Sequence, residues 1–257
     1  MIEVDRITFK YPEEEVSVFE NFSWSISQDR YAVLGPSGCG KTSLLYLLAG
    51  LYLPGNGEIR VNGEKITRPR PGTGLILQDY GLLPWSDVRT NVSLGLEIRR
   101  FYGPDGKHAP RVDERKRQLP EKVDFWLDKL GLGHFADKYP SQLSGGQRQR
   151  AAIARTLVLE PDVLLMDEPF SSLDAPTRES LQELTMNLCE EQGITLLLVT
   201  HTIEEAVFIG HQVLLLDEPP NRFARVIDNP HAGSDNYRHA PEFQELTQDL
   251  RSRMGSK

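Results

Sequence analysis

Five short apolar runs constrain the fold of this chain more than any other feature of its sequence. None of them alternates apolar with polar residues, and they occupy residues 31–34, 75–77, 163–166, 195–199 and 213–216. Strands without alternation are buried on both faces, as in a parallel sheet covered by helices. Sites in such sheets lie beyond the carboxyl ends of the strands. The residues that follow these runs are therefore the first candidates for chemistry.

A glycine-rich motif follows the first run. It fits the pattern G-x-x-x-x-G-K-[ST] and reads Gly35-Pro36-Ser37-Gly38-Cys39-Gly40-Lys41-Thr42. A helical run over residues 43–49 comes next, so its N-terminus and the loop's N–H groups can face phosphate oxygens. Lys41 can reach the outer phosphates and the Thr42 hydroxyl can ligate Mg²⁺. The alternative is a glycine-rich turn with a lysine placed by chance, and Cys39 is expected to be a passive small residue rather than a nucleophile.

Two carboxylates, Asp167 and Glu168, stand at the end of the run 163–166. In nucleotide-hydrolysing proteins with such a loop, a carboxylate at this place holds the Mg²⁺ shell. A second carboxylate can act as a base on the attacking water. By position, Asp167 takes the metal role and Glu168 the role of the base. The alternative is an acidic turn that closes a strand.

A second candidate anion site is the serine–glycine turn, which reads Leu143-Ser144-Gly145-Gly146-Gln147. Ser144 suits the N-cap of the helical run 148–159, and the two glycines leave their N–H groups open. One nucleotide does not need both sites within one chain. A head-to-tail dimer resolves this, with each nucleotide between the first motif of one copy and the second motif of the other.

Together, these motifs and their order resemble the ATP-binding cassette (ABC) family over nearly the whole chain, up to about Asp217. The resemblance implies an α/β fold: a P-loop NTPase core with a mixed, largely parallel sheet, an N-terminal antiparallel β part and an inserted helical subdomain. It implies that ATP is bound and hydrolysed with Mg²⁺, with Lys41, Glu168 and His201 in the catalytic roles.

Further residues take roles from the same resemblance. Gln78 would belong to the loop that links the two subdomains and would reach the Mg²⁺, and His201 would contact the γ-phosphate. Residues 171–174 would form the dimer-contact loop. Tyr11 would stack on adenine, and Ser43 would contact an inner phosphate. Taken singly, each has a structural alternative: a solvated loop residue for Gln78, a satisfied histidine for His201, a core or rim aromatic for Tyr11 and a helix cap for Asp174.

One segment points to a branch of the family. Residues 78–85 read Gln78-Asp79-Tyr80-Gly81-Leu82-Leu83-Pro84-Trp85, which resembles importers of nitrate, alkanesulfonates and taurine. The resemblance implies coupling to uptake through a separate membrane permease, a second copy as partner and, indirectly, a solute-binding protein. Residues 82–85 would receive a short permease helix, or else pack into the core. The competing classes are a non-transport ABC ATPase of DNA repair or translation, and a phosphate-binding regulator without turnover, which Glu168 disfavours.

Composition narrows the partners. The formal net charge of −8 disfavours a general nucleic-acid role, and Arg148, Arg150 and Arg155 are expected to be solvated or engaged within the chain. Two distant cysteines favour a reduced, cytosolic setting. The first ten residues do not resemble a signal peptide, and the longest apolar run, 194–199, is far below the roughly 20 residues that span a bilayer. We expect a peripheral protein on the cytoplasmic face of a membrane.

The chain divides by character into a nucleotide-binding domain over residues 1–217, with the helical subdomain inserted at about 81–159, and a tail over 218–257. The spacing of Val123, Trp126, Leu127 and Leu130 predicts one face of a helix. The charged stretch 99–119 predicts an exposed loop or helix edge. The proline-rich tail predicts loose packing and a short helix near residues 242–250.

Overall fold

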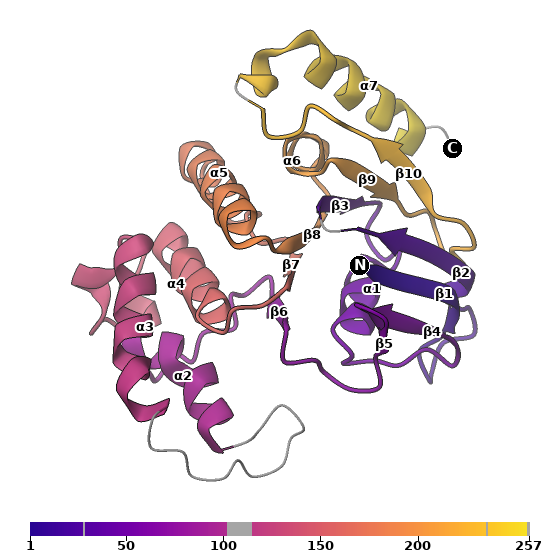
Figure 1. Ribbon diagram of the computed structural model, residues 1–257. Helices are drawn as coiled ribbons and strands as arrows, with labels where there is room; N and C mark the ends of the chain where they lie inside the picture. The colour runs from indigo at the N-terminus through magenta and orange to yellow at the C-terminus, as the bar shows by residue number, and fades with distance from the viewer. Residues whose placement is uncertain (28, 102–114, 235, 256–257) are drawn as a thin grey trace. The chain divides into compact units, whose positions relative to one another are not determined.

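The structure is a computed structural model that describes residues 1–27, 29–101, 115–234 and 236–255 (Figure 1). It divides into two compact units. Unit 1 comprises Met1–Arg70, Val163–Glu168 and Met186–Lys257, and unit 2 comprises Pro71–Asp162 and Pro169–Thr185. The predicted boundaries of the helical subdomain, 81–159, fall inside the first segment of unit 2 and stay a prediction.

The core of unit 1 is a largely parallel sheet. Its strands are β3 (Arg30–Leu34), β7 (Val163–Asp167), β8 (Thr195–Thr200), β9 (Gln212–Leu215) and β10 (Arg225–Asp228). They run in the order β10-β9-β3-β8-β7, and only β10 is antiparallel to its neighbour. Every residue of β7 and β8 is buried, as are four of the five residues of β3. The prediction of strands buried on both faces is confirmed for the runs of β3, β7, β8 and β9. It is wrong for the run 75–77 in unit 2, where Leu75 is half-buried and Leu77 is exposed.

Two helices cover this sheet and fix the place of the site. Helix α1 (Lys41–Leu48) packs against β7 and β8, and helix α6 (Ile203–Ile209) packs against β3 and β8. The strand register pairs Leu34 with Thr200 and Val199 with Asp167. The residues after β3, β7 and β8 therefore share one edge of the sheet.

A second, antiparallel sheet in unit 1 has the order β2-β1-β4-β5: β1 (Ile2–Phe9), β2 (Phe19–Ile26), β4 (Asn56–Val61) and β5 (Glu64–Lys65). In β1 the side chains of Ile2, Val4, Ile7 and Phe9 are buried. This is the antiparallel β part that the family resemblance implied.

The predicted loose tail is wrong, because residues 218–250 contain several buried contacts within unit 1. Strand β10 pairs with β9, and helix α7 (Pro241–Gly255) packs on α6 (Figure 1). The buried amide of Asn229 donates to the carbonyl oxygens of Val207 at 2.6 Å and Gly210 at 2.9 Å, and it accepts from the Tyr237 hydroxyl at 2.6 Å. The predicted helix near 242–250 is confirmed within the longer α7.

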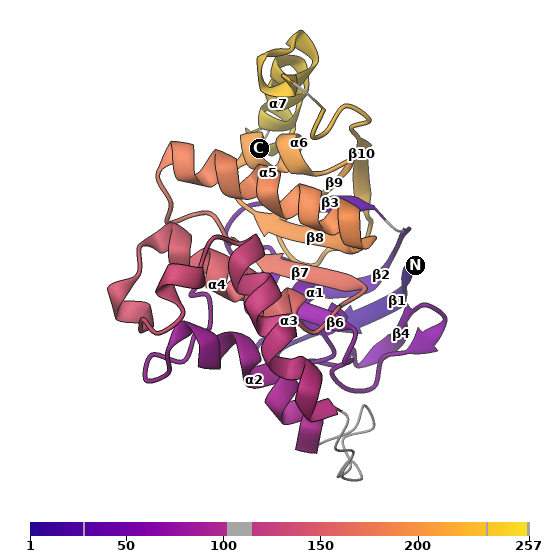
Figure 2. The same cartoon turned by 60° about the vertical axis from the view of Figure 1, so that its left-hand side comes forward.

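Unit 2 is mostly helical. Figure 2 shows α2 and α3 side by side, and both pack on α4. Its elements are β6 (Thr73–Ile76), α2 (Val88–Phe101), α3 (Arg115–Lys129), α4 (Gly145–Leu157), two short 3₁₀ helices, η1 (Gly133–Phe135) and η2 (Pro140–Gln142), and the first part of α5 (Ala175–Gln192). Within the described residues, no helix combines the length and the apolar character needed to cross a membrane.

The helix predicted from Val123, Trp126, Leu127 and Leu130 is confirmed as α3, and all four side chains are buried. The charged stretch 99–119 was predicted to be an exposed loop or a helix edge. At its two ends α2 continues to Phe101 and α3 begins at Arg115, which agrees with the helix-edge alternative. The remainder of that prediction, residues 102–114, lies outside the described residues.

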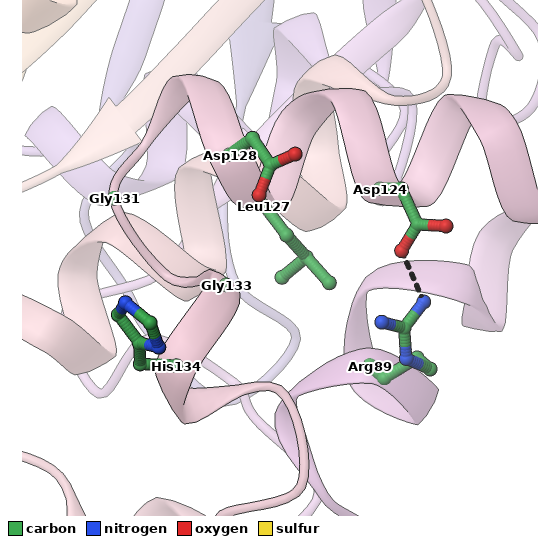
Figure 3. A pocket seen from close by; sticks show the side chains of 7 residues that line it. All are labelled: Arg89, Asp124, Leu127, Asp128, Gly131, Gly133 and His134. Atoms are coloured by element: carbon green, nitrogen blue, oxygen red, sulfur yellow. Dashed lines mark hydrogen bonds and ion pairs between the residues drawn. The ribbon is translucent and has the colours of Figure 1, made fainter.

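A polar pocket of about 500 Å³ lies where α2, α3 and η1 meet (Figure 3). An ion pair between the Arg89 guanidinium and the Asp124 carboxylate, 2.5 Å apart, joins α2 to α3 along its wall. The remaining lining residues are Leu127, Asp128, Gly131, Gly133 and His134. This ion pair connects the first turn of α2 to α3.

Candidate functional site

The phosphate loop, residues 35–42, joins β3 to α1 at the shared edge of the parallel sheet. Gly40 has φ of +105°, and a Cβ there would lie 2.4 Å from Val18 Cγ1, so only glycine fits. Gly38 has φ of +77° with open space around it. Helix α1 begins with no side-chain cap and no acidic residue in its first turn. Its N-terminal amides are therefore left to bind an anion.

Lys41 is held within this loop by its backbone. The buried Lys41 Nζ donates to the carbonyl oxygens of Gly35 at 2.9 Å and Pro36 at 2.8 Å. These bonds keep a positive charge at the loop, where a phosphate oxygen could replace a carbonyl. Cys39 is buried, and burial raises the pKa of its thiol, so the passive role expected from the sequence is physically consistent.

Asp167 and Thr42 lie together at the start of α1 and the end of β7. The Thr42 hydroxyl donates a hydrogen bond to the Asp167 carboxylate. Burial raises the pKa of Asp167 above its ordinary value, while the Thr42 hydrogen bond and the nearby Lys41 charge act in the opposite direction. A buried carboxylate of this kind is stabilised by a cation.

This donor set fits Mg²⁺. The described residues contain no cluster of three or more His, Cys, Asp or Glu side chains that could enclose a metal ion. A single carboxylate with one hydroxyl suits Mg²⁺ bound together with phosphates, because Mg²⁺ keeps several waters and takes few protein ligands. Thr42 and Asp167 are the residues of unit 1 that would hold it.

Glu168 and His201 form a pair beside this carboxylate. The His201 Nδ1 and the Glu168 Oε2 are 3.0 Å apart, and the two residues follow neighbouring strands β7 and β8. Glu168 has φ of +45°, a left-handed conformation that is uncommon for a residue with a side chain. Its backbone N–H donates to the Val199 carbonyl at 2.9 Å, which holds the turn in place. More than half of the His201 side chain is exposed, so the imidazole can reach a ligand.

Tyr11 lies next to the phosphate loop. Its hydroxyl is 2.8 Å from the Ser43 Oγ, and its ring makes edge contacts with Phe9 and Tyr52 at centroid distances of 5.1 and 5.7 Å. The ring is half-buried in this aromatic cluster. The adenine-stacking role of Tyr11 and the phosphate contact of Ser43 stay predictions.

Asn221 supports the loop and could not be found from the sequence. Its buried amide Nδ2 donates to the carbonyl oxygens of Cys39 at 2.8 Å and Val18 at 3.3 Å, while its Oδ1 accepts from the Asp217 backbone N–H at 2.9 Å. The residue lies in the segment predicted as a loose tail. A lone asparagine among prolines gives no periodic or motif signal, so only the fold shows its role.

The serine–glycine turn caps a helix in unit 2, as the sequence predicted. The Ser144 Oγ accepts from the Gln147 backbone N–H at 3.3 Å, and the Gln147 side chain accepts from the Ser144 N–H at 2.8 Å. This capping box uses two amides and fixes the first turn of α4. The contacts of Ser144, Gly145 and Gly146 with a nucleotide stay predictions.

Gln78 is exposed in unit 2, and its role toward a metal also stays a prediction. Asp174 caps α5, because its Oδ2 accepts from the Thr177 N–H at 3.3 Å. Trp85 is 74% exposed, which excludes the alternative that it packs into the core of unit 2. Its neighbours Leu82 and Leu83 are half-buried.

The three arginines of α4 act within the chain, as expected. The Arg150 guanidinium donates to the Leu130 carbonyl at 3.2 Å. The guanidinium of Arg155 donates to the carbonyl oxygens of Tyr80 and Gly81, and that of Arg148 donates to the Leu143 carbonyl. These contacts leave no arginine stripe along α4 for a nucleic acid.

Comparison with known proteins identifies the family of the chain. The family model described as "ABC transporter" matches residues 19–171. The chain is 38% identical over 234 residues to the aliphatic sulfonates import ATP-binding protein SsuB of Bacillus cereus, covering 90% of this chain and 86% of that protein. It is 43% identical over 201 residues to the taurine import ATP-binding protein TauB of Roseobacter denitrificans, covering 78% and 70%.

A solved structure shows the same fold. The ATP-binding cassette MJ0796, a dimer in a post-hydrolysis state bound to ADP and Pi, matches with a TM-score of 0.71 and 30% sequence identity, covering 89% of this chain and 98% of that one. The family match covers more than half of the chain and includes the phosphate loop, the serine–glycine turn, Asp167 and Glu168. From its sequence, its fold and these likenesses, the chain belongs to the ABC transporter family of ATPases.

Proposed function

We propose that this chain is the ATP-hydrolysing subunit of an importer, acting as a dimer with a separate permease at the cytoplasmic face of a membrane. The observation that carries the proposal is the meeting of Lys41, Thr42, Asp167, Glu168 and His201 at one edge of the parallel sheet. A cation, a candidate metal carboxylate and a base are groups that phosphoryl transfer to water uses, and the imidazole adds a hydrogen-bond donor beside them.

Each of these groups has a distinct task. Lys41 and the amides of the phosphate loop bind the outer phosphates of ATP and fix the orientation of its triphosphate group. The Glu168 carboxylate takes the proton of the attacking water, because a base must lie within hydrogen-bond reach of the proton that it removes. The His201 imidazole orients Glu168 and donates a hydrogen bond toward charge that develops on the γ-phosphate.

Mg²⁺, when bound by Thr42 and Asp167 together with the nucleotide, would neutralise charge on the phosphate oxygens. The Thr42 hydroxyl and the Asp167 carboxylate are already in contact, so little rearrangement is needed to bind it. The raised pKa of Asp167 supports this assignment, because a desolvated carboxylate gains more from a cation than a solvated one does.

The dimer proposal rests on the two anion sites of the chain. The phosphate loop and the serine–glycine turn each present free amides at the start of a helix, and a single nucleotide does not need both within one copy. The dimeric state of MJ0796 with ADP and Pi supports the same arrangement here.

The transported solute is proposed to be a small molecule of the nitrate, sulfonate or taurine class. Support comes from the import proteins SsuB and TauB, named for aliphatic sulfonates and taurine. The same names disfavour a non-transport role in DNA repair or translation. A permease helix is proposed to bind at residues 82–85, where the exposed Trp85 offers an aromatic anchor.

Co-purification with the permease from the same transport system tests this proposal. Trp85→Ala should weaken assembly by roughly tenfold or more, because a buried aromatic anchor contributes a few kcal/mol. The matched control is Phe223→Ala, which removes an aromatic side chain that is 79% exposed in unit 1. Assembly that is equally strong in the parent and the Trp85 variant would refute this docking surface. An absence of ATP hydrolysis in the purified parent chain would refute the enzymatic part.

A further inference from the structure

Tyr80 contacts three functional loops of unit 2 at once. We propose that Tyr80 is a positioning residue that holds the turn around Gln78, the serine–glycine turn and the dimer-contact loop in one arrangement, and thereby sets the affinity of the ATP-driven dimer. This inference rests on the proposed function, because it assigns the last two loops to a dimer interface. All of the contacts that carry it lie within unit 2.

The backbone of Tyr80 closes the turn that contains Gln78. The Tyr80 N–H donates to the Leu77 carbonyl at 2.9 Å, and the Gly81 N–H donates to the Asp79 carbonyl at 2.7 Å. Tyr80 and Gly81 both have φ of +62°. A left-handed conformation is strained for a bulky residue such as tyrosine, and it persists only where surrounding contacts determine it.

Arg155 supplies those backbone contacts from α4. Its guanidinium donates to the Tyr80 carbonyl at 2.8 Å and also to the Gly81 carbonyl. Burial lowers the pKa of this guanidinium from its ordinary value, and the two carbonyl groups stabilise its charge. The strained turn is therefore fixed to the same helix that the serine–glycine turn begins.

The side chain of Tyr80 reaches the dimer-contact loop, residues 171–174. Tyr80 is only 7% exposed, and its hydroxyl lies 2.7 Å from the Ser172 Oγ. Ser172 itself is exposed. A buried ring thus ends in a hydrogen bond to a surface loop, which is 92 residues away in the sequence.

The same hydroxyl lies against the serine–glycine turn. A Cβ added to Gly145 would lie 3.8 Å from the Tyr80 hydroxyl oxygen and 3.1 Å from Leu173 Cδ2. The Arg148 guanidinium lies over the Tyr80 ring at 5.8 Å from its centroid. The turn around Gln78, the serine–glycine turn and residues 172–173 therefore lie close together around one aromatic side chain.

Because the ring and the hydroxyl of Tyr80 have different contacts, substitutions can test the role of the hydroxyl separately from that of the ring. Tyr80→Phe keeps the ring beside the Arg148 guanidinium and removes the hydroxyl, with its hydrogen bond to Ser172. Ser172→Ala removes the same bond from the other side. The experiment uses the purified full chain carrying Glu168→Gln, which should accumulate an ATP-bound dimer, and measures the dimer association constant with Mg·ATP by sedimentation velocity.

We expect each single variant to weaken the ATP-bound dimer by about fivefold to tenfold, the scale of one neutral hydrogen bond. The ATP-bound dimer of the double variant should be no weaker than that of either single variant, because both substitutions remove the same hydrogen bond. ATP affinity, measured with a fluorescent ATP analogue at concentrations where the chain is monomeric, should stay within twofold. A purely structural role would not produce this split between dimer and nucleotide affinity.

The matched control is Tyr237→Phe, which removes a tyrosine hydroxyl bonded to buried Asn229 in unit 1. It should lower the melting temperature and leave the dimer constant unchanged. If the parent dimerises and Tyr80→Phe dimerises equally well, the positioning role is refuted. Additive losses in the double variant would also refute it. If the parent itself shows no ATP-dependent dimer, the proposed function fails instead, so the two failures are distinguishable.

Discussion

The substitution Glu168→Gln tests whether the Glu168 carboxylate is the base that takes the proton of the attacking water. The His201 Nδ1 lies 3.0 Å from Glu168 Oε2, and the Glu168 backbone is held through its N–H at φ of +45°. Glutamine has the same shape, and its amide oxygen can still accept a hydrogen bond from His201. The substitution therefore changes proton affinity and little else. Losing a general base lowers the rate by about 10²–10⁴, which adds roughly 3–5.5 kcal/mol to the barrier.

The assay is phosphate release by the purified chain under saturating Mg·ATP, with ATP affinity measured separately. We expect turnover to fall by at least a hundredfold while ATP affinity stays within threefold and an ATP-bound dimer accumulates. The control is Glu160→Gln, because Glu160 also has a positive φ of 53° but forms an exposed ion pair with Lys122. Turnover within threefold of the parent in the Glu168 variant would show that this carboxylate is not the base.

Three further changes address the proposed metal carboxylate Asp167, the proposed anion site at the serine–glycine turn, and the support of the phosphate loop. Asp167→Asn should raise the melting temperature of the nucleotide-free chain at pH 7, because the raised folded pKa means that ionising this carboxyl weakens the folded state. The gain in melting temperature should shrink as the pH falls through the folded pKa toward the unfolded value near 3.9. A gain that persists at low pH contradicts the assignment. Ser144→Arg should block the ATP-bound dimer in size-exclusion chromatography while monomeric ATP affinity is kept, with Ser144→Ala as the control for the lost cap, and equal loss of ATP binding would make the turn purely structural. Asn221→Ala should lower the free energy of unfolding by about 3 kcal/mol through three lost hydrogen bonds and should also weaken ATP binding. Asn229→Ala should lower the free energy of unfolding as much and leave ATP binding intact. Identical ATP affinities in the two variants would exclude a role for Asn221 in the loop.

The parallel strands and the phosphate loop could be predicted because their signals are local. A strand buried on both faces must be apolar throughout, and β7 and β8 contain such continuous runs. The phosphate loop needs glycine where the backbone is left-handed or crowded, as at Gly40, so its sequence pattern follows from its geometry. The pairing of Glu168 with His201 follows from the fold once both are placed at the ends of neighbouring parallel strands.

Other features depend on contacts that leave no local pattern. Strand β10 has no buried residue, so nothing in its side chains distinguished it from a loop. The segment around Asn221 and Asn229 is held by buried amides rather than by an apolar face. The sequence gives no signal for the contacts of Tyr80, because they depend on a positive φ and on a hydrogen bond to a residue far along the chain.

The antiparallel pairing of β10 with β9 also concerns solubility. Without β10, strand β9 would present unpaired N–H and C=O groups along a strand whose Val213, Leu214 and Leu215 are buried, and open apolar edges of this kind template aggregation. Strand β10 is four residues long and begins and ends with the charged Arg225 and Asp228, the features that discourage further strand addition. A fragment ending at Asp217 would keep every nucleotide motif yet expose that edge. Shortened versions of this chain should therefore retain residues through at least Asp228.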